Sequence, residues 1–306
     1  MKESSSFRTL SLSAVWLWLI IFALIPNLAL FLVTFFDRTE TQYFIPAFTL
    51  DNYARLFDPV FISVFIKSMY LASASTLVCL LVGYPFAYVL ARSSQRARPW
   101  LLLLVVIPFW TNSLIRTYAL MTLLKSQGVI NKFLNFLGIV EGNYSLMYGD
   151  LAVFIGLTYT LLPFMILPLY ASIEKMDVRL LDASKDLGAG PLRSFYHITL
   201  PLTLPGIVAG CILVFLPSLV MFYIPEFLSG STSLLLGSFI KNQFLVSRDW
   251  PMGAAASTIL TILLIVMALV YRVVSKKAAE TDISQVLGDE GEAQPRHNTR
   301  VTGGQA

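Results

Sequence analysis

Long stretches without a charged side chain alternate with short polar connections along most of this chain. A helix needs about 20 mostly apolar residues to cross the hydrocarbon core of a bilayer. Six stretches are long enough, so the pattern predicts an all-α membrane protein with six transmembrane helices. The predicted spans lie in the stretches 9–36, 68–91, 99–115 with its continuation past Arg116 to Leu124, 151–173, 194–225 and 250–271.

The first stretch is predicted to be a retained span. Its apolar part, 14–36, is much longer than the core of a secretory signal, which has about 7–15 residues, and no small-residue cleavage site follows it. Pro26 and Asn27 are candidates to kink this helix. The last segment, 276–306, is rich in Glu, Gln, Gly, Thr and Asp and has little apolar periodicity, so we expect a mobile tail there.

Composition and charge support this interpretation and orient the spans. The chain is 56% hydrophobic and 13% charged, whereas a soluble domain carries about 25% charged residues. The segments on the side of both termini hold twelve Lys and Arg, against six in the loops of the other side. The excess of basic residues predicts a cytoplasmic N-terminus over 1–12, a membrane domain over 13–275 and a cytoplasmic tail over 276–306. The basic pI of about 9.0 therefore needs no nucleic-acid partner.

One cytoplasmic connection, 174–193, has the pattern of a short amphipathic helix. Met176, Leu180, Ala183 and Leu187 follow one another at helical spacing, and Gly188 stands where a helix commonly ends in a left-handed residue. Periodicity alone favours a helix resting on lipid headgroups over one that docks on a protein.

The residues of this connection resemble the EAA loop of ABC-importer membrane subunits. The glycine, isoleucine, leucine and proline stand at the spacing of that family, with aspartate and serine in place of the usual glutamate and second alanine. In that family the loop, here 174–201, forms a coupling helix that sits in a groove of a cytoplasmic ATPase. The resemblance implies that ATPase coupling falls on Asp182, Ala183, Ser184, Gly188, Ile198, Leu200 and Pro201.

Further strings extend the resemblance over about 16–271, and they are similar to permease subunits of bacterial spermidine/putrescine importers. They are 48–59, 83–87, 108–116, 161–164 and 248–254. The resemblance implies a type I ABC importer permease fold with six spans in the bacterial inner membrane. It also implies a second homologous permease, two copies of a cytoplasmic ATPase and a periplasmic polyamine-binding protein. Iron(III) or thiamine remain alternative cargoes of the same class.

Three observations bear on other classes of function. The chain lacks the glycine-rich loop that cradles ATP phosphates, so ATP and Mg²⁺ would bind to a partner subunit and no cofactor is expected in this chain. A self-sufficient carrier usually shows a repeated half, and no repeat is evident. With two His and two Cys, a membrane enzyme with a metal site is not expected.

Residues that could line a substrate path are few. Glu226 follows Phe222 by four residues and Tyr223 by three, so all three share roughly one helical face near the end of the fifth span. A carboxylate with aromatic faces suits an ammonium group, although Glu226 could equally face water at a helix end. Trp110 is predicted near the middle of the third span, about 15 Å from its inner end by helical rise, either packed against another helix or lining a path.

Three other ionisable residues are assigned structural roles. Arg116, about 25 Å along the third span, and Lys67, early in the second, can reach the interface by snorkelling. Asp150 opens the fourth span, where the helix dipole favours an acid.

Overall fold

The computed structural model describes residues 5–38, 45, 47–138, 146–230 and 234–292, with side chains described up to 276. These residues form helices and one isolated bridge between Asp37 and Ile45. The α-helices are α1 (Ser5–Leu19), α2 (Ile25–Val33), α3 (Asp51–Arg55), α4 (Pro59–Arg92), α5 (Arg98–Val106), α6 (Ser113–Leu124), α7 (Val129–Phe136), α8 (Asp150–Lys175), α9 (Arg179–Asp186), α10 (Pro191–Ser194), α11 (Leu200–Val220), α12 (Tyr223–Leu228), α13 (Leu236–Leu245) and α14 (Trp250–Glu292).

Five helical segments are long and apolar enough to cross a membrane, and a bent pair makes a sixth when it is counted as one span. The five are Ser11–Val33, Pro59–Arg92, Asp150–Lys175, Pro191–Val220 and Trp250–Lys276. The all-helical class predicted from the sequence is therefore confirmed on the described residues. The first span is not a uniform helix: α1 and α2 are joined by a π-helical turn, Ile20–Leu24, just before Pro26.

The third predicted span is wrong as a straight helix. Arg98–Trp110 and Ser113–Phe136 meet at an angle of 93°. Pro108 lies in a 3₁₀ turn, and the Asn112 side chain caps α6 by accepting a hydrogen bond from the N–H of Leu114 at 2.8 Å. An Asn cap marks a helix start, so the depth predicted for Arg116 from a continuous helical rise does not apply. Trp110 precedes the bend, and its predicted depth stays a prediction.

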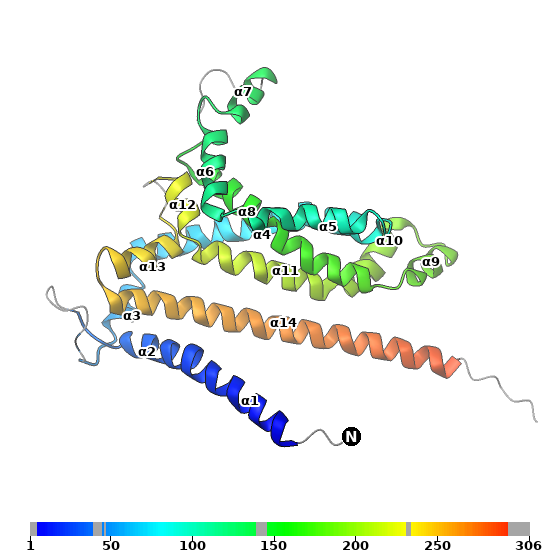
Figure 1. Ribbon diagram of the computed structural model, residues 1–306, viewed down its shortest axis with the longest axis horizontal. Coiled ribbons are helices and arrows are strands. Elements are labelled where there is room, and N and C mark those ends of the chain that lie inside the picture. Colours follow the sequence, from blue (N-terminus) through cyan, green and yellow to red (C-terminus); the bar gives the residue numbers. More distant parts are fainter. Residues whose placement is uncertain (1–4, 39–44, 46, 139–145, 231–233, 293–306) are drawn as a thin grey trace, which may run out of the picture.

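Helices α4, α8 and α11 pack together as the core of the molecule, and α14 runs along α11 (Figure 1). Small residues allow the close approach of α8 and α11. A Cβ added at Gly206 on α11 would overlap the Ser172 side chain and lie 2.9 Å from the Pro168 carbonyl oxygen. Contacts of this kind are typical of membrane helices, whose association depends on close packing.

The α1–α2 segment lies apart from the core and contacts α14 through α2 (Figure 1). Nothing in its most apolar window is buried by this chain. An apolar helix without cover from its own chain fits a lipid or partner-facing surface, in agreement with a retained membrane span.

The bundle has two ends, which we call the α9 end and the α3 end (Figure 1). At the α3 end, the side chain of Asp249 is 1% exposed and pairs with Arg55 at 2.7 Å and Arg38 at 3.1 Å. It also accepts the N–H of Met252 in the first turn of α14, at 3.1 Å. This cluster ties the segment between α2 and α4 to the start of α14.

The boundary predicted for the tail needs a correction. Helix α14 runs through the predicted boundary at 276 and continues to Glu292. The sequence after Lys276 begins Lys-Ala-Ala-Glu, and these are strong helix formers, which explains the extension. Residues 293–306 of the predicted mobile tail lie outside the described residues.

Candidate functional site

The 174–201 loop forms one end of the molecule (Figure 1). Helix α9 ends with Gly188 in the left-handed region, at φ +77°. The N–H of Gly188 donates to the carbonyl of Lys185 at 2.8 Å, and that of Ala189 donates to Ser184 at 2.9 Å. These two bonds make a Schellman motif, which satisfies the last carbonyls of the helix. The predicted helix end at Gly188 is confirmed.

The apolar stripe predicted on this helix is correct in spacing but faces outward. Leu180 is 37% exposed and Leu187 is 88% exposed, and Ala183 between them is exposed too. The buried member of α9 is Ser184, which follows Leu180 by four residues and so lies at the edge of the same stripe, where it contacts α10. Met176 precedes α9 and is buried in the core. The loop thus presents an uncovered apolar face, which fits a surface that another molecule covers.

A pair of hydroxyl groups joins α9 to α10. The Oγ atoms of Ser184 and Ser194 lie 2.8 Å apart, and both residues are buried. Each hydroxyl donates one proton: Ser184 donates to the carbonyl of Leu181 at 2.8 Å, so Ser194 donates to Ser184, with the Gly190 carbonyl at 3.3 Å as its longer alternative acceptor. The serine that departs from the family pattern is therefore the residue that links the two helices. Asp182, on the exposed face, pairs with Lys185 at 2.9 Å.

The second half of the loop leads directly into a membrane span. Ile198 and Thr199 lie in a π-helical turn, and Leu200 and Pro201 open α11. Pro201 lacks an N–H, so the wider turn before it leaves fewer carbonyls without a partner. Helix α10, the π turn and α11 form one continuous helical segment from Pro191 to Val220.

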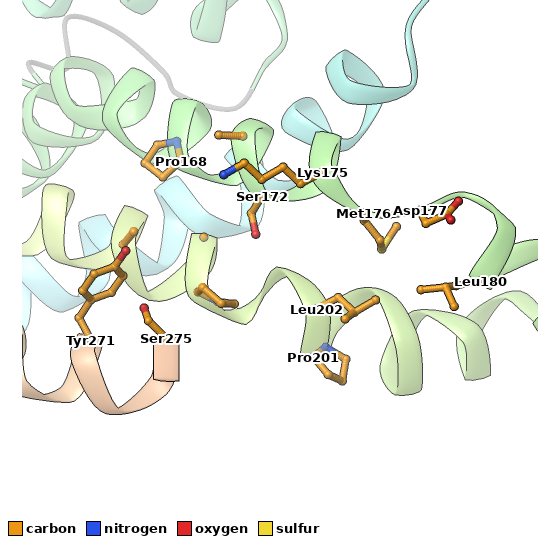
Figure 2. A pocket seen from close by; sticks show the side chains of 14 residues that line it. Pro168, Ser172, Lys175, Met176, Asp177, Leu180, Pro201, Leu202, Tyr271 and Ser275 are labelled. Carbon is orange, nitrogen blue, oxygen red and sulfur yellow. The ribbon is translucent and has the colours of Figure 1, made fainter. Parts of the chain in front are cut away.

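A cleft of about 560 Å³ lies between the base of this loop and the bundle. Figure 2 shows its walls: the end of α8 with Lys175, the residues before α9, the start of α11 with Pro201, and Tyr271 and Ser275 of α14. On the α5 side, Arg98 pairs with Glu174 at 2.6 Å. The start of the 174–201 loop is thus held by an ion pair, and the cleft separates the base of the loop from the bundle.

At the opposite end, the chain breaks after α11 and restarts as α12. The fifth span ends at Val220 rather than continuing to Pro225, because Met221 has an extended backbone with ψ 112°. Phe222 caps α12, and Glu226 lies in its first turn. The predicted grouping persists: the N–H of Glu226 donates to the carbonyl of Phe222 at 3.2 Å, and the rings of Phe222 and Tyr223 lie 6.3 Å apart at 88°.

Glu226 is neither free in water nor a simple helix cap. Its two carboxylate oxygens accept hydrogen bonds from Nζ of Lys241, on α13, at 2.6 and 2.7 Å. The same Nζ lies 5.5 Å from the centre of the Phe222 ring. A carboxylate and an aromatic face thus surround one primary ammonium group, which is the chemistry that the sequence predicts for Glu226 and Phe222, with Lys241 as the cation.

The other predicted path residues differ in their surroundings. Tyr223 is partly buried against the core. Trp110 is 77% exposed, so packing against a helix of this chain is wrong for it, whereas its neighbour Phe109 packs edge-on against Phe164 at 5.0 Å. Residues that line a path between subunits must be uncovered in one subunit, and Trp110 meets that requirement.

Two of the residues assigned structural roles form an ion pair: Lys67 and Asp150 lie 2.8 Å apart and join α4 to the first turn of α8. Snorkelling of Lys67 and Arg116 stays a prediction. His197 contacts the Arg193 carbonyl at 3.0 Å, and neither Cys79 nor Cys211 is in a disulfide. Within the described residues no group of three His, Cys, Asp or Glu could hold a metal ion.

Sequence reasoning missed Lys241, Ser194 and the two arginines at Asp249. Each meets its partner across at least ten positions of the chain, and Arg55 and Asp249 are 194 positions apart. In the sequence Lys241, Arg38 and Arg55 were visible only as positive charges in the loop counts, and Ser194 gave no signal.

Residues 83–279 match the model of the binding-protein-dependent transport system inner membrane component family. The match covers more than half of the chain, and the chain belongs to this family. It is therefore a multi-pass inner-membrane component of a transport system rather than an enzyme. The EAA-like loop and most of the bundle lie within the matched region.

Individual relatives match this chain at 46–48% sequence identity. The spermidine/putrescine transport system permease protein PotB of Salmonella typhimurium SL1344 is 46% identical over 284 residues, which cover 92% of this chain and 99% of PotB. PotB of Escherichia coli K12 is 48% identical over 264 residues, covering 85% of this chain and 96% of that protein.

Solved structures agree on the fold. A chain in the crystal structure of a bacterial alginate ABC transporter, in complex with its pentasaccharide-bound periplasmic protein, superimposes with a TM-score of 0.70 at 18% identity. The match covers 89% of this chain and 94% of the other. The arrangement of helices is therefore that of an ABC importer permease.

Proposed function

We propose that the chain is the membrane-spanning permease subunit of an ATP-driven importer that passes polyamines, spermidine and putrescine, from a periplasmic binding protein into the cytoplasm. The observation that carries the proposal is the 46% identity to a PotB protein over 92% of this chain and 99% of the relative. Similarity over the full length of both chains includes the loop and the α12 region together.

In this proposal the α9 end faces the cytoplasm, together with both termini. Twelve basic residues lie on that side against six on the other, which is the bias of cytoplasmic loops. The α3 end, with α12 and α13, faces the periplasm and receives cargo from the binding protein. A second, homologous permease completes the path, and the exposed Trp110 faces it.

Two copies of a cytoplasmic ATPase bind ATP and Mg²⁺ and act on the 174–201 loop. The exposed face with Leu180 and Leu187 enters a groove of the ATPase, and the Ser184–Ser194 bond keeps α9 and α10 moving together. Ile198, Leu200 and Pro201 continue into α11. ATP-driven movement of the loop therefore reaches α11 and, beyond Val220, the α12 region.

The test is uptake in a bacterium that lacks its own polyamine importers and carries this chain with its partner subunits. We expect uptake of radiolabelled spermidine that unlabelled putrescine reduces and that iron(III) or thiamine leaves unchanged. No uptake of spermidine, together with uptake of radiolabelled iron(III) or thiamine by the same cells, would assign the cargo to another solute of the same class. Uptake that persists without the ATPase genes would contradict the ATP-driven mechanism.

Substitution of Glu226 tests the path itself. A charge-assisted hydrogen bond to an ammonium contributes about 1.5–3 kcal/mol, so Glu226→Gln should lower uptake at limiting spermidine about tenfold or more. Asp51→Asn, which removes an exposed acid in the first turn of α3 at the same end, is the matched control and should leave uptake unchanged. Equal effects of the two variants would show that only the overall negative charge matters.

A further inference from the structure

The cation at Glu226 has the same chemical form as one end of the proposed cargo. A lysine side chain is a four-carbon stem that ends in a primary ammonium, and putrescine and the longer arm of spermidine are aminobutyl groups. The structure places this aminobutyl group with both oxygens of Glu226 at 2.6 and 2.7 Å and with the Phe222 ring at 5.5 Å. The chain therefore already contains one example of what this site binds.

We infer that Lys241 is a tethered occupant of the ammonium site formed by Glu226 and Phe222, which cargo must displace in order to bind there. The inference rests on the proposed polyamine function. Between transport cycles Lys241 neutralises Glu226, so no unpaired carboxylate stands beside the membrane-spanning bundle, where an uncompensated charge is costly. When a polyamine arrives, its terminal ammonium takes the place of Nζ on the same three groups.

The site is open enough for this exchange. The side chain of Glu226 is 49% exposed and that of Lys241 is 23% exposed, and Phe222 is 42% exposed. Exposed ion pairs and exposed cation–π contacts are weak individually. The buried alternative for comparison is Asp249, which is 1% exposed and held by two arginines. Glu226 is thus an acid whose partner can leave without exposing a buried charge.

The tether also provides a route for release. Because Lys241 stays attached to α13 after it is displaced, its ammonium remains close to Glu226 and to the bound cargo. Its return competes with the cargo, and its positive charge repels the cargo's own ammonium groups. The exposed ion pair and the exposed cation–π contact together hold Lys241 in the site with an equilibrium constant of about ten, so Lys241 should weaken cargo binding about tenfold.

Equilibrium binding to the permease–ATPase complex tests the inference. The complex is purified in nanodiscs without the binding protein, which would itself bind cargo, and is titrated with radiolabelled spermidine. Lys241→Gln should tighten binding about tenfold, whereas Lys241→Arg, which keeps a cation beside Glu226, should bind at least as weakly as the wild type. Lys125→Gln is the charge-matched control, because Lys125 caps α6, which packs against α12; it should leave binding unchanged.

A simple monoamine separates displacement from general electrostatics. Butylamine has the stem and ammonium of Lys241 in a free form, so it should compete with spermidine about tenfold more effectively in Lys241→Gln than in the wild type. Adding Glu226→Gln to Lys241→Gln should abolish this gain. In the Glu226→Gln background the lysine substitution should have little effect, since its partner is already absent.

Specific results would overturn the inference. Unchanged or weaker spermidine binding in Lys241→Gln, with normal amounts of intact complex, would show that Lys241 is a fixed structural partner. Equal tightening in Lys125→Gln would assign the effect to net charge alone. Both outcomes leave the proposed function standing, whereas a wild-type transporter that takes up no polyamine in cells would remove that function first.

Discussion

Gly188 allows a sharp test of the loop, because the structure separates backbone strain from contact. Its φ of +77° is disfavoured for L residues, yet a Cβ added there meets no atom of this chain within 4 Å. The cost of Gly188→Ala within the chain is therefore conformational, about 1–2 kcal/mol. That cost lowers the population of the native helix end about five- to thirtyfold.

Gly190 provides the matched control in the same loop. It too has open space around its Cβ position, but its φ is −70°, which any residue adopts. Gly190→Ala should therefore be nearly neutral. Gly188→Asn should fall between the two, because Asn tolerates the left-handed region better than Ala does.

The assay measures two properties of the loop together. One is the amount of ATPase that co-purifies with the permease from membranes, and the other is spermidine uptake per permease molecule. We expect Gly188→Ala to reduce both while the permease remains in the membrane at normal levels. We expect Gly188→Asp to reduce ATPase binding and uptake further, because it adds a carboxylate beside the exposed face of α9 that the ATPase covers in the proposed function.

Two results would refute this reasoning. If Gly190→Ala lowered ATPase binding and uptake as much as Gly188→Ala does, the left-handed φ of Gly188 would not explain the effect of its substitution. If Gly188→Asn abolished ATPase binding as completely as Gly188→Asp, the partner would fill the space beside Gly188, and contact rather than conformation would decide the effect.

Three further predictions concern stability, measured by thermal unfolding in detergent. Ser184→Ala and Ser194→Ala should each cost about 1 kcal/mol, and the double variant should cost less than the sum, because both changes remove the same hydrogen bond; strict additivity would contradict the link. Burial alone would raise the pKa of Asp249, but its bonds to two arginines and a backbone N–H hold that pKa below the ordinary 3.8. The stabilising contribution of the ionised Asp249 is therefore complete above about pH 4 and is lost as pH falls further. Asp249→Asn should make the unfolding temperature depend less on pH below about pH 4. An unchanged pH dependence in that range would refute this. Gly206→Val should lower the amount of folded protein, because the added side chain meets Ser172 and a backbone carbonyl, whereas Gly149→Ala, with nothing within 4 Å, should not; equal losses would refute the close-packing argument.

The sequence by itself determined the helical class, the places of most spans and the end of the loop helix. These features depend on local properties: the length of an apolar run, the distribution of Lys and Arg, and a glycine after a periodic segment. The resemblance of the 174–201 loop to a known family also needed only residues close together in the chain. The boundary predicted at 276 followed from composition, although the helix runs through it to Glu292.

The bend in the third span was decided by local capping that hydropathy does not register. Both halves of the span are apolar, so the mean hydropathy of a window that includes both halves stays high and does not detect the break. The turn depends on Pro108 and on the Asn112 side chain, which closes the start of α6. Trp110 is the last residue before this bend and is exposed, and the bend changes the course of the chain after it, including Arg116.

Only the tertiary structure decided which charges meet. Glu226 and Lys241 come from two short helices. The orientation of α12 depends on the break after Val220 and on packing against α6 and α8, and that of α13 on packing against α14, α11 and α4. Ion pairing falls off within a few ångströms, and sequence does not specify distances between separate helices. The sequence therefore identified an acid suited to an ammonium group, and the packing of α12 against α13 showed that the chain places its own ammonium there.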